Sequence, residues 1–461
     1  MFYNHRDTVR FKIKAMAATS MGMREFKTLV LTMMLSQLIF LPLLQGTPLS
    51  AHALEQQRQQ QGIETNTCIT FDSTENAIRI SCKYTNLTDI DNQLQNPDLL
   101  HKQTTDGVWL LNAGIIIEEG ATLYINSIDT SWLKIIAPSA DNEETVNGGE
   151  EDSKSEENEN ENPVAKANGI EVLGSLKIDS VKMTSWDPSS NNYAVNEGKR
   201  NLRGTEYEVE LGSPRPFISV EGEATGTTDI TNSEIAYLGY EGGVGGGPVV
   251  GLTYFGGDGS IISNNNIHHL YFAFYSNGVG HITIENNHIH DSGHYGLDPH
   301  TGTHDMIIRN NTVEDNGSIG IICSLDCYNI TIENNKVSNN TKIGIMFSRN
   351  MYDSIARDNI VSNEEQGILV SESHDNEVYN NTVSSSGSGI EVDKDSYDNT
   401  LHDNTMIDIP DPSDALFIEN GAAEQNTFYS NVLFAAGGNI VDLGEESMQE
   451  DSSDVSNNNN N

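Results

Sequence analysis

Short apolar and polar runs alternate from residue 264 to residue 406, and the alternation repeats at a nearly fixed period. An Asn two residues before Ile, Val or Met recurs at Asn265, Asn287, Asn311, Asn335, Asn359, Asn381 and Asn404. The intervals between these residues are 22, 24, 24, 24, 22 and 23. Glycines form a second column at Gly296, Gly320, Gly344, Gly367 and Gly389. A fixed period of this size indicates a stacked repeat.

Each period holds Ile- and Val-rich runs separated by Asn, Asp, Gly and Ser, with no stretch of helical periodicity. One period fits one coil of three short strands. The pattern therefore predicts an all-β fold, a right-handed parallel β-helix of the pectate-lyase type with ~22–24 residues per coil. A propeller is the alternative, but its blades need about twice this period. The Asn columns are expected at bends, because Asn tolerates left-handed backbone and stacked amides bond along the ladder.

The composition divides the chain into four parts. Residues 107–440 are expected to form the β-helix, interrupted by an acidic insert at 141–163. Residues 54–106 are expected to cover its open N-terminal end. The insert, with ten acids against one Lys over 141–162, and the acidic tail 441–461 lack the apolar residues that ordering requires, so both are predicted to be disordered.

Residues 1–53 have the features of a signal peptide. A basic residue precedes an apolar run, and the small-x-small sequence Ala51-His52-Ala53 predicts cleavage after Ala53. The alternative is a single membrane anchor, for which the run is near the lower length limit. We expect a secreted, periplasmic or cell-surface protein with no other membrane segment.

The net charge of −42 argues against nucleic acid as a partner, because phosphate binding needs clustered Lys and Arg. We expect a monomer. Four Cys in an exported chain favour disulfides, and Cys68–Cys82 with Cys323–Cys327 is the simplest of three connectivities. The second pair is less secure, because Cys323 falls in a predicted core column.

Alternation after each Gly of the second column assigns side chains to two faces. Two columns are apolar and predict the core: Leu297, Ile321, Ile345, Ile368 and Ile390, and Pro299, Cys323, Phe347, Val370 and Val392. The opposite face carries a column of His300, Ser324, Ser348, Ser371 and Asp393. Asp298 joins His300 on that face, with Tyr275 one coil earlier, so the sequence predicts a groove.

Two features near this groove are left open by the residues alone. Tyr295 is expected to point inward unless the chain bends at Gly296, which Gly permits. His268, His269, His288, His290 and His304 fall mostly at turns, where we expect solvated or stacked rings. No spacing among them is specific to a metal, so no metal site is predicted.

The sequence Tyr295-Gly296-Leu297-Asp298-Pro299-His300 resembles the signature of mannuronan C5-epimerases. The resemblance is strongest to their periplasmic branch and extends over residues 215–400. It implies C5-epimerisation of uronate residues in an acidic polysaccharide, with His300 as the base. It also implies that Tyr295 supports proton transfer and that Asp298 binds the carboxylate or orients its neighbours. No cofactor is expected, although some secreted members of the family use calcium.

The chain departs from the family at the residue that neutralises the substrate carboxylate. Leu325 stands where the periplasmic enzymes have an Arg, while Arg349 lies in the same column one coil later and Arg215 matches an upstream family Arg. Candidate substrate-binding residues are therefore Arg349, Arg215, Tyr275 and Lys342. Two other functions use the same groove, a polysaccharide lyase that expels the C4 substituent and a non-catalytic carbohydrate-binding protein.

Overall fold

The computed structural model describes residues 68–138, 167–195, 214–241, 249–393, 395–419, 421–422, 425–435 and 439–443. All of them belong to one compact unit, residues 65–461. The predicted signal peptide at 1–53 and acidic insert at 141–163 lie outside the described residues, as does the tail from 444. None of the helices in the described ranges is long and apolar enough to cross a membrane.

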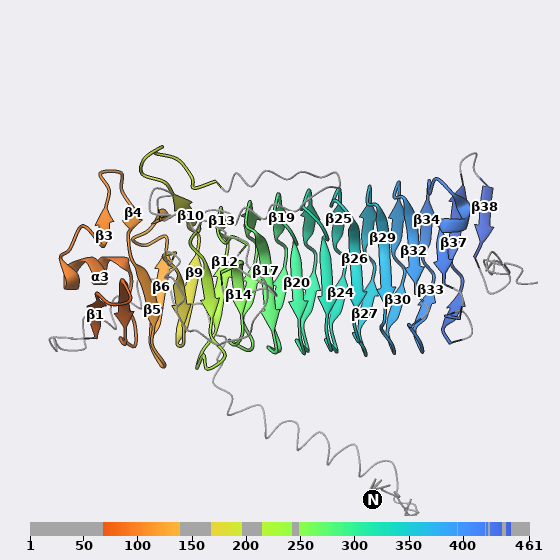
Figure 1. Ribbon diagram of the computed structural model, residues 1–461, viewed down its shortest axis with the longest axis horizontal. Helices are drawn as coiled ribbons and strands as arrows, with labels where there is room; N and C mark the ends of the chain where they lie inside the picture. Colours follow the sequence, from red (N-terminus) through yellow and green to blue (C-terminus); the bar gives the residue numbers. More distant parts are fainter. Residues whose placement is uncertain are drawn as a thin grey trace, which may run out of the picture. The chain divides into compact units, whose positions relative to one another are not determined.

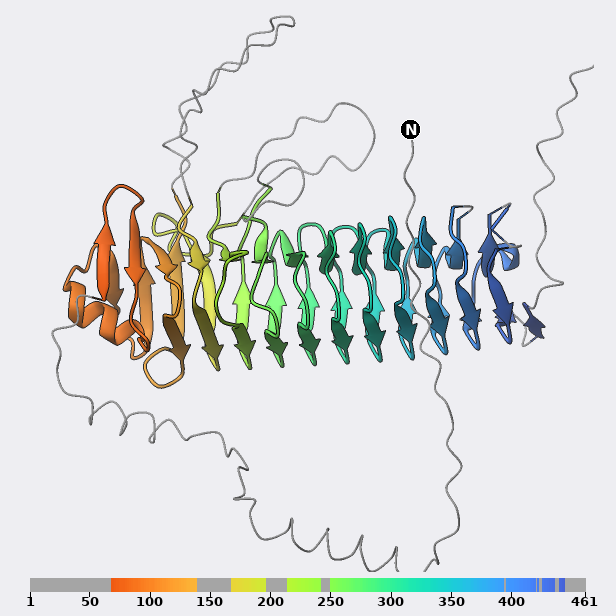
Figure 2. The ribbon, with the colours of Figure 1, turned by 90° about the horizontal axis from the view of Figure 1, so that it is seen from below.

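Three long sheets run side by side, which confirms the right-handed parallel β-helix (Figures 1 and 2). Sheet A, with 13 strands, contains β1 (Ile69–Asp72), β2 (Ala77–Ile80), β5 (Gly114–Ile117), β8 (Ile170–Val172), β11 (Ile218–Val220), β14 (Gly251–Tyr254), β17 (Phe272–Asn277), β20 (Leu297–His300), β23 (Ile321–Ser324), β26 (Ile343–Ser348), β29 (Gln366–Ser371), β32 (Ser388–Val392) and β35 (Leu416–Ile418). Sheet B, with 11 strands, contains β6 (Thr122–Asn126), β9 (Ser175–Asp179), β12 (Thr228–Thr231), β15 (Ile261–Ser263), β18 (Thr283–Glu285), β21 (Ile307–Arg309), β24 (Thr331–Glu333), β27 (Ile355–Arg357), β30 (Glu377–Tyr379), β33 (Thr400–His402) and β36 (Thr427–Tyr429). Sheet C, with 14 strands, contains β3 (Leu100–Lys102), β4 (Val108–Leu111), β7 (Trp132–Ile136), β10 (Lys182–Trp186), β13 (Glu234–Ala236), β16 (Asn266–His268), β19 (His288–His290), β22 (Thr312–Glu314), β25 (Lys336–Ser338), β28 (Ile360–Ser362), β31 (Thr382–Ser384), β34 (Thr405–Ile407), β37 (Val432–Ala435) and β38 (Asn439–Asp442).

Each coil contributes one strand to each sheet, so residues one period apart become neighbours. His300 pairs with Ser324, which pairs with Ser348. The predicted core columns are buried, with Leu297, Ile321 and Ile345 at most 1% exposed.

The predicted Asn column is a buried ladder of side-chain amides. Asn287 donates from Nδ2 to Oδ1 of Asn311 at 3.0 Å, and Asn311 donates in the same way to Asn335 at 3.1 Å. The residue before each ladder Asn has left-handed backbone, with φ of 56° at Asn286 and 55° at Asn310. The two adjacent residues therefore have different roles. The first has the left-handed backbone of the bend, and the second hydrogen-bonds to the ladder Asn of the next coil.

The Gly column lies where sheet A begins, directly over core valines of sheet C. A Cβ at Gly320 would lie 2.7 Å from Cγ1 of Val337, and one at Gly344 would lie 2.4 Å from Cγ1 of Val361. Only Gly fits this close approach.

The residues before β5 cover the N-terminal end of the core. β1 and β2 form an antiparallel hairpin, and Cys68 is joined to Cys82 by a disulfide. Helix α3 (Leu87–Leu94) buries Leu87 and Ile90 in the core and lies beside β1 and β3 (Figure 1). At the other end, β38 pairs antiparallel with β37 and runs to Asp442, slightly beyond the boundary expected at 440.

Candidate functional site

Two neighbouring coils, those of β17 and β20, bring the ionisable residues of sheet A together. Tyr275 of β17 pairs in register with Asp298 of β20, and Asn277 pairs with His300. The rings of Tyr275 and His300 have centroids 5.6 Å apart. Asp298, His300 and Tyr275 therefore share the outward face that the sequence assigned to them.

Tyr295 reaches this outward face because the chain bends at Gly296. A Cβ on Gly296 would lie 2.7 Å from Cγ1 of the core residue Val313, so Gly296 and the next residue, Leu297, both face inward. Strict alternation is broken there, and Tyr295 packs instead against Phe272, with ring centroids 5.0 Å apart. The condition set by the sequence for Tyr295 to join the site is met.

The contacts of His300 indicate which ring nitrogen carries the proton and which carries the lone pair that can act as a base. Nη2 of Arg349 lies 3.3 Å from Nε2 of His300, and Arg has no acceptor, so Nε2 accepts. Nδ1 of His300 lies 2.6 Å from Oγ1 of Thr301 and carries the proton in this arrangement. Burial, with the nearby Arg349 cation, lowers the pKa of His300 to about 4. His300 is therefore neutral at pH 7, with its Nε2 lone pair directed at Arg349.

Asp298, two residues before His300 on the same strand, is only 3% exposed. Among the described residues, its Oδ1 atom has no hydrogen-bond partner. Burial raises the pKa of Asp298 well above its usual value, against the opposing effect of Arg349. Asp298 therefore binds a proton more readily than an exposed carboxyl group does, and in its protonated form it can donate one hydrogen bond to a substrate oxygen.

Arg349 supplies the cation near His300 that Leu325, at the equivalent turn one coil earlier, does not supply. Both residues have left-handed backbone at the turn after their strands, with φ of 52° and 60°. The guanidinium of Arg349 reaches back one coil, where Nε and Nη2 donate to Oγ of Ser324 at 3.0 and 2.5 Å. Neighbouring strands are only about 4.8 Å apart, so an Arg side chain spans this offset. From Ser324 on β23, Nη2 of Arg349 also reaches His300 on β20, two coils before the coil of Arg349.

Two other candidate cations are not part of this cluster. Arg215 is 5% exposed, and its guanidinium donates to the backbone carbonyls of Gly239, His269 and Leu238 at 2.6, 3.1 and 3.2 Å. These three bonds use three of the five guanidinium N–H donors and hold the buried side chain in place, and a role of Arg215 in substrate binding stays a prediction. Lys342 is exposed at the opposite end of β26 from Arg349.

The predicted Cys323–Cys327 disulfide does not form. Both thiols are free and buried in the core, and Sγ of Cys327 donates to the carbonyl of Ser324 at 3.1 Å. The alternation that places Cys323 in the core explains this outcome.

The turn histidines mostly stack on rings of the next coil. His268 stacks on His290 with centroids 4.9 Å apart, and His304 stacks on Tyr328 at 5.0 Å. In the described ranges, no three His, Cys, Asp or Glu side chains are placed to hold a metal ion together.

An apolar wall beside the site was not predicted as part of it. Ile319, Ile322 and Ile343 are buried on the outer face, and Tyr295, Met346 and Leu369 pack against them. The sequence contained a signal for this wall, because aliphatic residues follow Asp298 in its outward-facing column.

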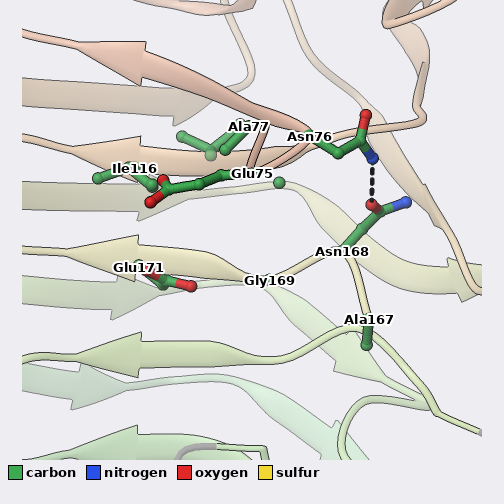
Figure 3. A pocket seen from close by; sticks show the side chains of 10 residues that line it. Glu75, Asn76, Ala77, Ile116, Ala167, Asn168, Gly169 and Glu171 are labelled. Carbon is green, nitrogen blue, oxygen red and sulfur yellow. Dashed lines mark hydrogen bonds between the residues drawn. The ribbon is translucent and has the colours of Figure 1, made fainter. Parts of the chain in front are cut away.

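A separate shallow pocket lies on β2, β5 and β8, well before the site in the stack (Figure 3). Glu75 and Glu171 are the charged residues of its lining, which contains no His, Lys or Arg. Glu75 of this lining is neutralised by an ion pair with Arg79 at 2.6 Å and the lining contains no His, so we place the candidate active site at His300 instead.

The fold and site define a class, the right-handed parallel β-helices with an ionisable cluster on an outward face of one sheet. Residues 225–410, two fifths of the chain, match the sequence family described as periplasmic copper-binding protein (NosD). No curated protein sequence matches the chain significantly.

Solved structures resemble the chain more extensively. The periplasmic alginate epimerase AlgG is 19% identical over 77% of this chain and 85% of its own, with a TM-score of 0.57. A double mutant of AlgG is 20% identical over 78% and 84%, with a TM-score of 0.56. The A-module of the mannuronan C-5 epimerase AlgE4 from Azotobacter vinelandii is 13% identical over 72% and 85%, at 0.46. At these identities the AlgG likeness establishes the fold.

Proposed function

We propose that the protein is an exported carbohydrate-active enzyme that epimerises uronate residues of an acidic polysaccharide at C5. The observation that carries this proposal is Nη2 of Arg349 at 3.3 Å from Nε2 of a His300 whose pKa is lowered, in a coil whose buried Asp298 carboxyl has a raised pKa. The likeness to AlgG supports the same chemistry, and the Cys68–Cys82 disulfide is typical of an oxidising compartment.

We assign each group a role in proton exchange at C5 as follows. The substrate carboxylate binds Arg349 and draws its guanidinium away from His300, while protonated Asp298 donates to a carboxylate oxygen. His300 Nε2 then takes the C5 proton, and the electron pair moves onto the carboxylate, where Arg349 and Asp298 stabilise the added charge. Tyr295 donates its hydroxyl proton to the opposite face of C5, and the proton on His300 later restores Tyr295 through solvent.

The environments of the aromatic groups support these roles. Burial raises the pKa of Tyr295 and of Tyr275, so both hydroxyls are protonated at pH 7. A protonated phenol can donate, and a neutral imidazole can accept, which is the pairing that the reaction requires. The copper named in the NosD description forms no part of the proposal, because no metal-binding cluster exists among the described residues.

The test is proton NMR of polymannuronate and other polyuronates incubated with the purified full chain, with His300→Gln as the matched control. Inverted uronate signals that His300→Gln fails to produce would support the proposal. Unsaturated chain ends would instead assign a lyase that expels the C4 substituent after the same proton abstraction. Binding without any product across the panel would contradict the enzyme proposal and favour a carbohydrate-binding protein.

A further inference from the structure

Arg349 differs from the other described arginines in the acceptors that its guanidinium contacts. The others are ion-paired with Glu or donate to backbone carbonyls, namely Arg79, Arg309, Arg357 and Arg215. Within the described ranges Arg349 forms no ion pair, and its guanidinium donates to two neutral acceptors, Oγ of Ser324 and Nε2 of His300. No carboxylate among these residues compensates the charge of Arg349, so that charge is available to an anionic ligand.

Ser324 makes the shorter contacts with this guanidinium. Its Oγ accepts from Nε at 3.0 Å and from Nη2 at 2.5 Å, whereas Nη2 lies 3.3 Å from Nε2 of His300. The direction of these bonds is fixed, because an Arg side chain has donors only. Ser324 is 0% exposed and pairs in register with His300 on one side and Ser348 on the other. Its hydroxyl therefore lies in the floor of the groove, beneath the guanidinium.

The small size of Ser324 matters as much as its hydroxyl. Arg349 follows β26, and its side chain crosses the coil of β23 to reach His300 on β20. A long side chain at position 324 would occupy the path of the guanidinium, and Ala or Gly would leave the path open without an acceptor. Ser at this position provides both the space and the acceptor.

The bonds to Ser324 leave one side of the guanidinium open. Its Nε and Nη2 atoms are directed at Ser324 and His300. In the part of the chain that the structure describes, Nη1 of Arg349 donates no hydrogen bond, so both of its N–H groups are unused. A carboxylate can accept from Nη1 and, once Nη2 turns away from His300, from Nη2 as well, which is the bidentate geometry that Arg favours.

We infer that Ser324 is a positioning residue for Arg349, which anchors the Nε side of the guanidinium and presents Nη1 to the carboxylate of the substrate. The inference rests on the proposed function and specifies how the uronate carboxylate is held. Because Nε stays on Ser324, Arg349 exchanges His300 for the substrate carboxylate without leaving the groove. Nε2 of His300 is then uncovered beside a carboxylate that is already neutralised.

The first measurement needs no substrate. It is an NMR titration of the full chain labelled at histidine, with the ring signals of His300 assigned by their absence in His300→Gln. Burial and then the Arg349 cation lower the pKa of His300, so Ser324→Ala, which releases the guanidinium, should raise that pKa by at least about 0.5. Ser348→Ala, in the same column one coil later, is the control and should leave the pKa unchanged. Three other titratable groups of the site stay in place in both variants, those of Tyr275, Tyr295 and Asp298.

A double-mutant cycle tests whether Ser324 acts through Arg349. Ser324→Ala should lower kcat/KM by about three- to tenfold, because the substrate carboxylate meets a guanidinium that is no longer held in place. In the Arg349→Ala background the same substitution should have no further effect. Ser324→Val puts a methyl group where the hydroxyl was, so that water cannot replace it, and should lose at least as much as Ser324→Ala.

Two results would overturn the inference. One is an unchanged pKa of His300 in both Ser324→Ala and Ser324→Val, and the other is an equal loss of kcat/KM from Ser324→Ala with and without Arg349. If the wild-type protein turns over no polyuronate, the enzyme proposal fails, whereas the pKa comparison still decides whether Ser324 holds Arg349 at His300.

Discussion

Polar side chains on the outer faces of sheets A and B differ in whether they find a partner on the neighbouring coil. On sheet B, a charged residue generally meets its complement on the next coil. Arg309 pairs with Glu285 at 2.7 Å, and Arg357 pairs with Glu333 at 2.5 Å. On sheet A, Oδ1 of Asp298 has no partner among the described residues, and His300 meets a cation from two coils away.

The difference shows how a repeat protein reveals a functional site. Stacking satisfies each polar group by repeating a compatible one at the next coil, so a satisfied column indicates stability. A coil that breaks its column leaves groups with shifted pKa and unused hydrogen-bonding capacity, which is costly unless a ligand uses them. Asp298 and His300 occupy such a coil.

The largest effect is expected when a histidine of the candidate site and a histidine of a stacked column are each replaced by Gln. His300→Gln should lower turnover by about 10²–10⁴-fold, because the base is lost, while the free energy of unfolding changes by less than about 1 kcal/mol. His374→Gln removes a ring stacked on Tyr352 and Tyr397 and should leave turnover unchanged. Initial rates from product NMR and urea unfolding measure both. Equal loss of turnover in the two variants would refute the contrast.

The Asn ladder should show the reverse behaviour. Asn335→Leu removes donors to Asn359 and Ile308 and the acceptor for Asn311, all buried. We expect a loss of about 2–4 kcal/mol in the free energy of unfolding, with turnover per folded molecule unchanged. The exposed neighbour Lys336→Ala is the control and should change stability by less than about 0.5 kcal/mol. Chemical denaturation of both variants is the measurement, and a stable Asn335→Leu protein would contradict a structural role for the ladder.

The fold was predictable from sequence because period, alternation and the Asn and Gly columns all specify the same coil. The outward placement of Asp298 and His300 followed from alternation alone. Long side chains were not predictable in this way, since their reach across coils is not encoded in sequence spacing. The contact of Arg349 with His300 could therefore be seen only in the structure. The same holds for Arg215, which is a buried donor to backbone carbonyls. The bend that brings Tyr295 outward was foreseen only as a condition on Gly296.

Moving the cation by one coil sharpens the comparison further. Arg349→Ala should lower kcat/KM by about 10–100-fold, because the substrate carboxylate loses its neutralising charge. Adding Leu325→Arg to that variant should recover part of the loss, since residues 325 and 349 occupy equivalent turns on adjacent coils. Arg357→Ala on sheet B removes an equal charge and should leave kcat/KM unchanged. Equal losses in Arg349→Ala and Arg357→Ala would show that only the global charge matters.

The last comparison concerns the pH dependence of stability, where Asp298 and His300 oppose each other, so that the net slope in the wild-type protein is smaller than either contribution. The pKa of His300 is lowered to about 4, so between pH 4 and about 6.5 the unfolded chain binds a proton that the folded chain does not. Stability from this group therefore rises with pH across that window. The pKa of Asp298 is raised, so above pH ~4 the unfolded chain releases a proton that the folded chain retains, and stability falls as pH rises.

Each substitution should expose the contribution of the other group. Asp298→Asn keeps a neutral side chain and removes the falling component, so its stability relative to wild type should increase steadily above pH ~4. His300→Gln removes the rising component, so its advantage should be greatest near pH 4 and should vanish by about pH 6.5. Urea unfolding from about pH 4.5 to 8 measures both differences. If Asp298→Asn runs parallel to wild type across this range, Asp298 is ionised in the folded protein, and its proposed role as a hydrogen-bond donor is wrong.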